Sequence, residues 1–287
     1  MSEVTITIDE RGRLVTAVLA ASHWPQQEQA ELTHAVHPHA KQTRHFVEAF
    51  QDHAAVQGVN ALLASGTAVD DLFAAAFCCN WPDMTPQEPL PAGISVEWTA
   101  ALADFGRKTA VPSFWAEHEA MWHEALTDLE AICQYSRLPA FIERLTGRPL
   151  HKNLTAMPNL VYPALHSILA ETVYSLYLLL PPPKAVGESP PWPYREGPDW
   201  VLAEACHRLV AYSLATVFAQ AGPAREQLIT RAAITLFLEE ALGDAEAMSY
   251  MVRCKRQFKL PALPMAVDEL REFMQGNGRS LFDLSIP

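Results

Sequence analysis

The pattern of apolar and polar positions predicts a mainly helical chain with a few short strands. Apolar side chains recur at helical spacing over long stretches of the sequence. The segments expected to be helical are residues 26–76, 96–105, 113–137, 138–147, 200–212, 224–242 and 244–254. Strands are expected over residues 4–8, 154–162 and 172–180, where alternating, β-branched or aromatic residues gather. Residues 14–21 are one more apolar run, which fits either a helix or the second strand of an initial hairpin.

A long loop separates the last predicted strand from the helix at residues 200–212. It spans residues 184–199 and is rich in proline. Loops of this length inside a folded domain are often functional, so we expect it to flank a cleft. The aromatic residues on and beside the loop are Trp192, Tyr194 and Trp200. These rings would offer apolar contacts to a peptide-like ligand, or they would only fasten the loop to the domain.

Composition narrows the classes of function. The chain has 287 residues, of which 49% are hydrophobic and 19% charged, as in folded globular proteins. Its formal net charge of −12 argues against nucleic acid or an anionic membrane as the main partner. No apolar run reaches membrane-spanning length, and the first residues lack the features of a signal peptide. We therefore expect a soluble cytoplasmic protein, and its five cysteines, which form no CxxC pair, to be free thiols.

Two groups of residues have the chemistry of metal ligands. Four histidines (His34, His37, His39 and His45) crowd one segment, but Pro38 interrupts it and the spacing matches no standard metal site. Glu119 and His123 lie four residues apart in the predicted helix 113–137, so they share one helix face. An exposed polar pair is the expected role of these two residues, and a metal site is the alternative.

The segment Ala203 to His207, with the sequence AEACH, lies inside the predicted helix 200–212. A histidine at position 203 would make it HExxH, in which two histidines one turn apart hold zinc and the glutamate activates a metal-bound water. Glu204 occupies the general-base position and His207 that of the second ligand. The methyl side chain of Ala203 cannot bind a metal. Taken alone, a Glu and a His at this spacing also occur by chance.

The order of segments along the chain resembles a family of predicted bacterial metallopeptidases, catalogued as domain of unknown function 4932. The resemblance spans nearly the whole chain. It includes ITIDERGRLVTAVL, HFVEAFQDHAAV, FWAEHEAMWHEAL, the strands before the central helix, AEACHRLV and EQLITRAAITLF. That family is similar to gluzincins, in which the two histidines of HExxH and a glutamate on a later helix hold zinc. The resemblance implies that AEACH stands where the family has HExxH.

The same resemblance implies that metal ligands have been lost. In such sequences the later glutamate precedes an Arg-Ala pair by four residues. Here that pair begins at Arg231, which places Gln227 at the third ligand position. One imidazole and an amide do not make the set of about three protein ligands that a catalytic zinc needs. Without a metal-bound water Glu204 has no proton to abstract, so the resemblance implies a degenerate site in a retained fold.

Three hypotheses on function follow. The first is a metallopeptidase-like pseudoenzyme, a scaffold or regulator that binds a peptide or protein partner and needs no cofactor. The second is an active hydrolase that uses a rearranged zinc site or Glu204 and His207 as a metal-free acid-base pair. Groups that the fold could add to that site are Glu119, His123, His166, Glu239 and Glu240. The third is a di-iron bundle, which would require two copies of Glu-x-x-His.

We expect an α+β, zincin-like (gluzincin-type) catalytic domain with a small β-sheet before the motif helix and a largely helical N-terminal half. Residues 1–150 are expected to form a mainly helical N-terminal subdomain. Residues 151–287 are expected to form the zincin-like subdomain, and the two together one compact unit.

Overall fold

The structure is a computed structural model, and it describes residues 4–31, 35–161, 167–184 and 191–276. The chain is a mixture of α and β structure, mostly helical, with two small sheets among the described residues. It divides into two compact units, which are described separately. The sheet unit comprises residues 5–130 and 152–196, and the helical unit comprises residues 1–4, 131–151 and 197–287.

The sheet unit contains both sheets and the helices of the first half of the chain. Its elements in chain order are β1 (Thr5–Ile6), α1 (Glu10–Ala21), α2 (Trp24–Glu31), α3 (Pro38–Val47), the 3-10 turn η1 (Glu48–Phe50), α4 (Ala54–Ala64), α5 (Val69–Phe77), β2 (Cys79–Asn80), β3 (Thr85–Pro86), α6 (Val96–Thr109), α7 (Val111–Glu117), α8 (Glu119–Cys133), β4 (Asn153–Pro158), β5 (Ile168–Glu171), β6 (Ser175–Leu180) and the 3-10 turn η2 (Tyr194–Glu196). The last residues of α8 belong to the helical unit.

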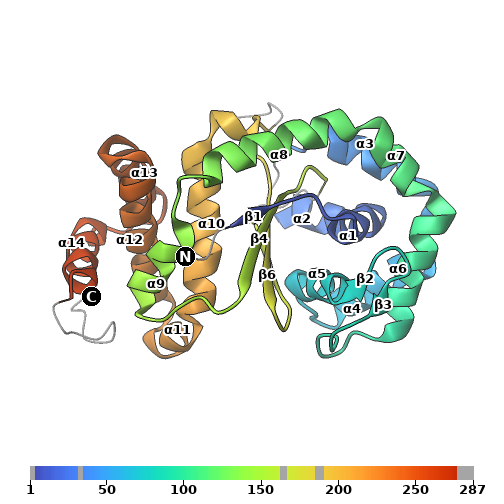
Figure 1. Ribbon diagram of the computed structural model, residues 1–287, viewed down its shortest axis with the longest axis horizontal. Coiled ribbons are helices and arrows are strands. Elements are labelled where there is room, and N and C mark those ends of the chain that lie inside the picture. The colour runs from blue at the N-terminus through green and yellow to red at the C-terminus, as the bar shows by residue number, and fades with distance from the viewer. Residues whose placement is uncertain (1–3, 32–34, 162–166, 185–190, 277–287) are drawn as a thin grey trace. The chain divides into compact units, whose positions relative to one another are not determined.

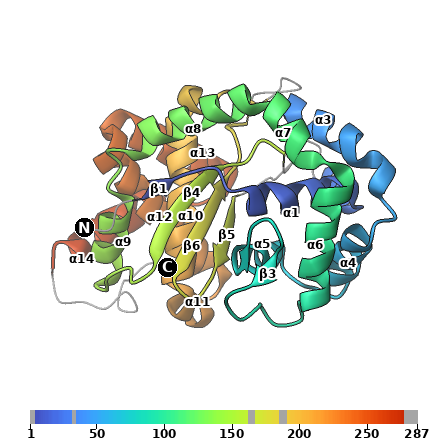
Figure 2. The same cartoon turned by 45° about the vertical axis from the view of Figure 1, so that its right-hand side comes forward.

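The larger sheet has the strand order β1-β4-β6-β5 (Figures 1 and 2). Strands β1, β4 and β6 are parallel, and β5 pairs with β6 in the antiparallel direction. The carboxyl ends of the parallel strands therefore lie at one edge of the sheet, which we call the carboxyl edge. Because β1 pairs with β4, the sheet combines strands from both sides of the boundary expected at residue 150.

The apolar run at residues 14–21 is helical and lies in α1. Every residue from Gly12 to Ala21 is buried, so no polar face reveals the helical period. The helix begins at a side-chain cap, in which Asp9 accepts a hydrogen bond of 2.9 Å from the amide of Arg11. The hairpin alternative is therefore wrong, because the turn at Asp9 starts a helix that is surrounded by protein.

Arg11 fastens the start of α1 to the end of α5. Its guanidinium pairs with Asp9 at 2.5 Å and donates hydrogen bonds to the carbonyl oxygens of Phe77 (2.8 Å) and Cys79 (3.0 Å). Its charged carbon also lies 5.4 Å from the ring centroid of Phe77 and 5.9 Å from that of Tyr177 in β6. Burial lowers the pKa of Arg11, but the contacts with Asp9 and Tyr177 outweigh it, and the pKa is raised. One side chain thus joins α1, α5, β2 and β6.

The predicted helix 113–137 is two helices, α7 and α8, which meet at His118. The backbone of His118 leaves the helical region (φ −112°, ψ 12°), while its ring Nδ1 contacts the carbonyl oxygen of Phe114 at 2.9 Å. Strand β5 has no counterpart in the predicted elements. It is four residues long, too short for a period to show in the sequence.

The helical unit consists of α9 (Leu138–Thr146), α10 (Pro198–Ser213), α11 (Ala215–Ala221), α12 (Pro223–Leu242), α13 (Asp244–Gln257) and α14 (Leu263–Met274). Helix α12 is its centre, since α9, α10, α11, α13 and α14 all contact it. Its residues 228–230 and 232–238 are buried. A helix surrounded by protein in this way is apolar on most of its surface.

None of the described helices is by itself both long enough and apolar enough to cross a membrane. Helices α10 and α11 reach that length and composition only when taken together, and they meet at an angle of 78°.

The close packing of α4 on α6 gives a test of the fold. A Cβ atom at Gly58 in α4 would lie 2.6 Å from Cδ1 of Trp98 in α6, whose indole is held by a hydrogen bond of 3.2 Å to the carbonyl oxygen of Ala55. We expect Gly58→Ala to lower the free energy of unfolding by about 1–3 kcal/mol, because the clash outweighs the gain in helix propensity. Denaturant unfolding measures this change.

Gly106→Ala in α6 is the matched control. A Cβ atom there would meet Cδ1 of Leu14 at 3.4 Å, an ordinary contact. This variant is expected to be neutral or more stable by about 0.5–1 kcal/mol. Equal stability of the two variants would contradict the packing of α4 on α6.

Candidate functional site

Helix α10 places the residues of AEACH in the helical unit. Ala203 and Cys206 are buried, whereas Glu204 and His207 are half-buried. The helix packs against α12, on which Gln227 is also half-buried. The two helices that carry the expected ligand positions are therefore neighbours within the helical unit.

A guanidinium lies near Glu204. Arg231 of α12 donates a hydrogen bond of 3.0 Å to the hydroxyl of Tyr250, and its charged carbon lies 4.4 Å from the ring centroid of Phe258. Burial lowers the pKa of Arg231, but Tyr250, Cys254 and the carboxylate of Glu204 outweigh it, and the pKa is raised. Glu204 thus lies within electrostatic reach of a fixed cation.

The other candidate ligands do not assemble around these residues. Within the part of the chain that the structure describes, no three His, Cys, Asp or Glu side chains come together as a metal site. Glu239 pairs with Arg271 at 2.7 Å, and Glu240 pairs with Arg144. His166 lies outside the described residues, as does His34 of the histidine-rich segment.

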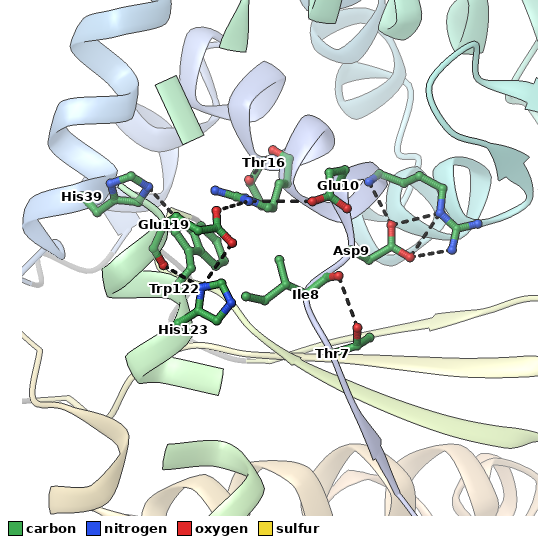
Figure 3. A network of polar contacts seen from close by, with 11 residues as sticks. Thr7, Ile8, Asp9, Glu10, Thr16, His39, Glu119, Trp122 and His123 are labelled. Atoms are coloured by element: carbon green, nitrogen blue, oxygen red, sulfur yellow. Dashed lines mark hydrogen bonds and ion pairs between the residues drawn. The ribbon is translucent and has the colours of Figure 1, made fainter. Parts of the chain in front are cut away.

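A second polar centre lies at the carboxyl edge of the sheet, in the sheet unit (Figure 3). Arg13 of α1 has 4% of its side chain exposed, and its charged carbon lies 4.6 Å from the ring centroid of Trp115 and 4.5 Å from that of Trp122. Its Nη1 approaches Glu119 at 3.5 Å and Glu10 at 3.9 Å. Burial lowers the pKa of Arg13, and the two carboxylates partly oppose this effect.

The other side of the Arg13 guanidinium faces the interior. Among the described residues, none accepts a hydrogen bond from its Nε or Nη2. A cavity of about 10 Å³, the size of a single water molecule, adjoins Arg13 and is also lined by Asp9, Thr16 and Asn159. Arg13 was not singled out from the sequence. The run of charges DERGR could have indicated it, because it follows a strand directly and so places charged side chains at a sheet edge.

Glu119 and His123 meet as an ion pair, with 3.3 Å between Nδ1 and Oε1. Both side chains are partly exposed, at 43% and 63%. The expected polar pair is therefore present, and it forms the solvent side of the Arg13 network (Figure 3).

His39 belongs to the core of the sheet unit. It is fully buried, stacks on the ring of Phe114 and accepts a hydrogen bond of 3.0 Å from Nε1 of Trp122 to its Nε2. Burial, followed by the charge of His118, lowers the pKa of His39 to about 4. Since Nε2 is already an acceptor, protonation would remove the bond from Trp122. Within the histidine-rich segment, His45 is exposed and His37 half-buried, so these rings share no site.

A larger pocket, of about 100 Å³, lies beyond the ends of β4 and β6 in the sheet unit. Its lining residues are His37, Met121, Glu124, Ala125, Asp128, Leu160, Pro182, Pro191, Trp192, Pro193 and Tyr194. Trp192 is 40% exposed. Open α/β sheets bind ligands outside the carboxyl ends of their strands, and this pocket has that position.

The main contacts of Tyr194 hold the end of the 184–199 loop against the sheet. Its side chain is 1% exposed, and its hydroxyl donates to the carbonyl oxygen of Leu180 (2.5 Å) and accepts from the amide of Asn159 (3.0 Å). It therefore joins the 184–199 loop to the carboxyl ends of β4 and β6. Residues 185–190 of that loop lie outside the described part of the chain. Trp200 belongs to α10 in the helical unit, so a cleft shared by all three aromatic residues stays a prediction.

No family model matches the chain, and no curated protein or solved structure matches it.

The buried His39 predicts how stability depends on pH. Above the ordinary pKa of 6.5 the ring is neutral in the folded and the unfolded chain. As the pH falls from 6.5 to about 4, the unfolded chain binds a proton that the folded chain does not, so the folded state loses stability. We expect a loss of about 3 kcal/mol from this residue by pH 4. Unfolding by urea at several pH values measures it.

His39→Gln keeps an acceptor for Trp122 but does not titrate, so it should lose less stability over this window. His45→Gln, at an exposed position of the same segment, should retain the pH dependence of the native chain. A His39 ring that titrates near 6.5 in an NMR experiment would refute the assignment.

Proposed function

We propose that the chain is a zincin-type protein that has lost zinc-dependent hydrolysis and acts by binding a peptide or protein partner. The observation that carries this proposal is that α10 and α12, the helices with the expected ligand positions, pack against each other. In a zinc peptidase the carboxylate at the position of Glu204 acts on a metal-bound water. Here Glu204 interacts with the guanidinium of Arg231.

The arrangement of α10 and α12 supports a degenerate site over a chance motif. The helices pack against each other, and they carry a buried alanine at 203 and an amide at 227. A methyl group and a neutral amide fill these positions without the charge that zinc requires of its ligands. We therefore propose that the fold is retained and that no zinc is bound.

A peptide or protein partner is suggested by the resemblance to peptidases. The outer strand of the sheet, β5, does not add to this, because helix α5 contacts it.

Restoring the two ligands tests the proposal. We expect the double variant Ala203→His with Gln227→Glu to bind about one zinc ion per chain, because it would complete the three-ligand set with His207. The native chain is expected to bind none. Metal analysis after exhaustive dialysis, with circular dichroism to confirm folding, measures both.

Adding His207→Ala to the double variant is the matched control and should abolish the gained zinc. A folded double variant without zinc would show that residues 203, 207 and 227 do not converge. Stoichiometric zinc on the native chain that is lost in His207→Ala would instead favour the active, rearranged hydrolase.

A further inference from the structure

The pocket beside Trp192 contains an excess of negative charge. Glu124 and Asp128 of α8 line it, and both pair with Nη1 of Arg195, at 2.6 Å and 3.5 Å. Two carboxylates and one guanidinium leave one negative charge unbalanced. His37 does not change this balance at neutral pH, because burial lowers its pKa to about 4 and keeps it uncharged.

The carboxylates still have room for another donor. Arg195 uses Oε1 of Glu124 and Oδ2 of Asp128. Within the described part of the chain, no hydrogen bond is donated to Oε2 of Glu124 or to Oδ1 of Asp128. An ionised carboxylate accepts through both oxygens. Asp128 has only 12% of its side chain exposed, so a cation beside it would be poorly hydrated and strongly attracted.

The rest of the wall is apolar. Trp192, Met121 and the neighbouring prolines surround the acidic groups. An indole face attracts a cation, and thioether and proline surfaces pack against methylene groups. The volume of about 100 Å³ is roughly two thirds of the 150 Å³ that hold a benzene molecule. The pocket therefore accommodates about four non-hydrogen atoms, as at the end of a lysine side chain.

We propose that this pocket binds an alkylammonium group, with the ammonium against Asp128 and Glu124 and the methylenes against Trp192 and Met121. The inference is independent of the proposed loss of zinc hydrolysis, because no residue of α10 or α12 takes part. Two sources share this chemistry: a free aliphatic amine and the lysine side chain of a partner.

The probe is n-butylammonium chloride, added to the native chain at constant ionic strength and followed by NMR. A ligand of this size binds in the millimolar range. Saturable shifts are expected, including that of the Trp192 indole. 1-Butanol and butyrate match it in length but lack the positive charge, and they should bind at least five-fold more weakly. Equal shifts from 1-butanol, or no saturation with n-butylammonium, would overturn the proposal.

Variants distinguish binding in the pocket from a general attraction of the cation to the acidic surface. Asp128→Asn, which can still accept from the amide of Arg195, should weaken binding at least five-fold. Trp192→Leu should also weaken it. Arg195→Gln should tighten it several-fold, because the competing guanidinium is removed. Glu130→Gln, an exposed carboxylate on the same helix, should change nothing, and equal effects of Asp128→Asn and Glu130→Gln would refute the site.

A final comparison identifies the source of the ammonium. The peptides acetyl-Gly-Lys-Gly-amide and acetyl-Gly-norleucine-Gly-amide differ only in the charged group. Tighter binding of the lysine peptide than of n-butylammonium supports a protein partner. Binding of n-butylammonium alone supports a free amine. Failure of both would overturn the proposal even if the zinc experiment succeeded.

Discussion

The sheet unit depends on one side chain, the guanidinium of Arg11. Removing a guanidinium from water is costly, and hydrogen-bond acceptors offset that cost. Arg11 finds them in the carboxylate of Asp9 and in the carbonyl oxygens at the end of α5. Asp9 also caps α1, so the ion pair lies where this helix begins. Because β1 is only two residues long, its ladder alone would hold it weakly, and Arg11 fixes the start of the helix that follows it.

The carboxyl edge brings together the charged groups of this unit. Arg13 lies between two tryptophan rings with carboxylates on one side, and the pocket beside Trp192 lies beyond the ends of β4 and β6. In both places an aromatic surface next to acidic groups stabilises a cation. Between the tryptophan rings the cation is the guanidinium of Arg13. In the pocket beside Trp192 we infer that the cation is a ligand. In the helical unit a guanidinium, that of Arg231, interacts with the carboxylate of Glu204.

Much of the helical content and three strands (β1, β4 and β6) were predictable. Amphipathic segments such as 244–254 show their period, because one face meets solvent and the other the core. The run at 14–21 did not, because α1 is buried on every side. The single helix expected at 113–137 failed at His118, where a ring contact with Phe114 accompanies the break. Of the residues singled out from the sequence, Glu119 and His123 form the expected exposed polar pair, whereas Arg13 was missed. The roles given to Glu204 and His207 stay predictions.

The sequence by itself determined the residue types: a glutamate and a histidine at the spacing of HExxH with an alanine at position 203, five cysteines without a CxxC pair, and a charged run after the first strand. Those properties follow from side-chain chemistry and spacing alone. Only the tertiary structure decided that Arg231 acts on Glu204, that β1 pairs with β4, and that Glu124 and Asp128 share a pocket with Trp192. The physical reason is that these contacts join residues far apart in the chain. No local pattern records such contacts, because they form only when burial of the core brings the segments together.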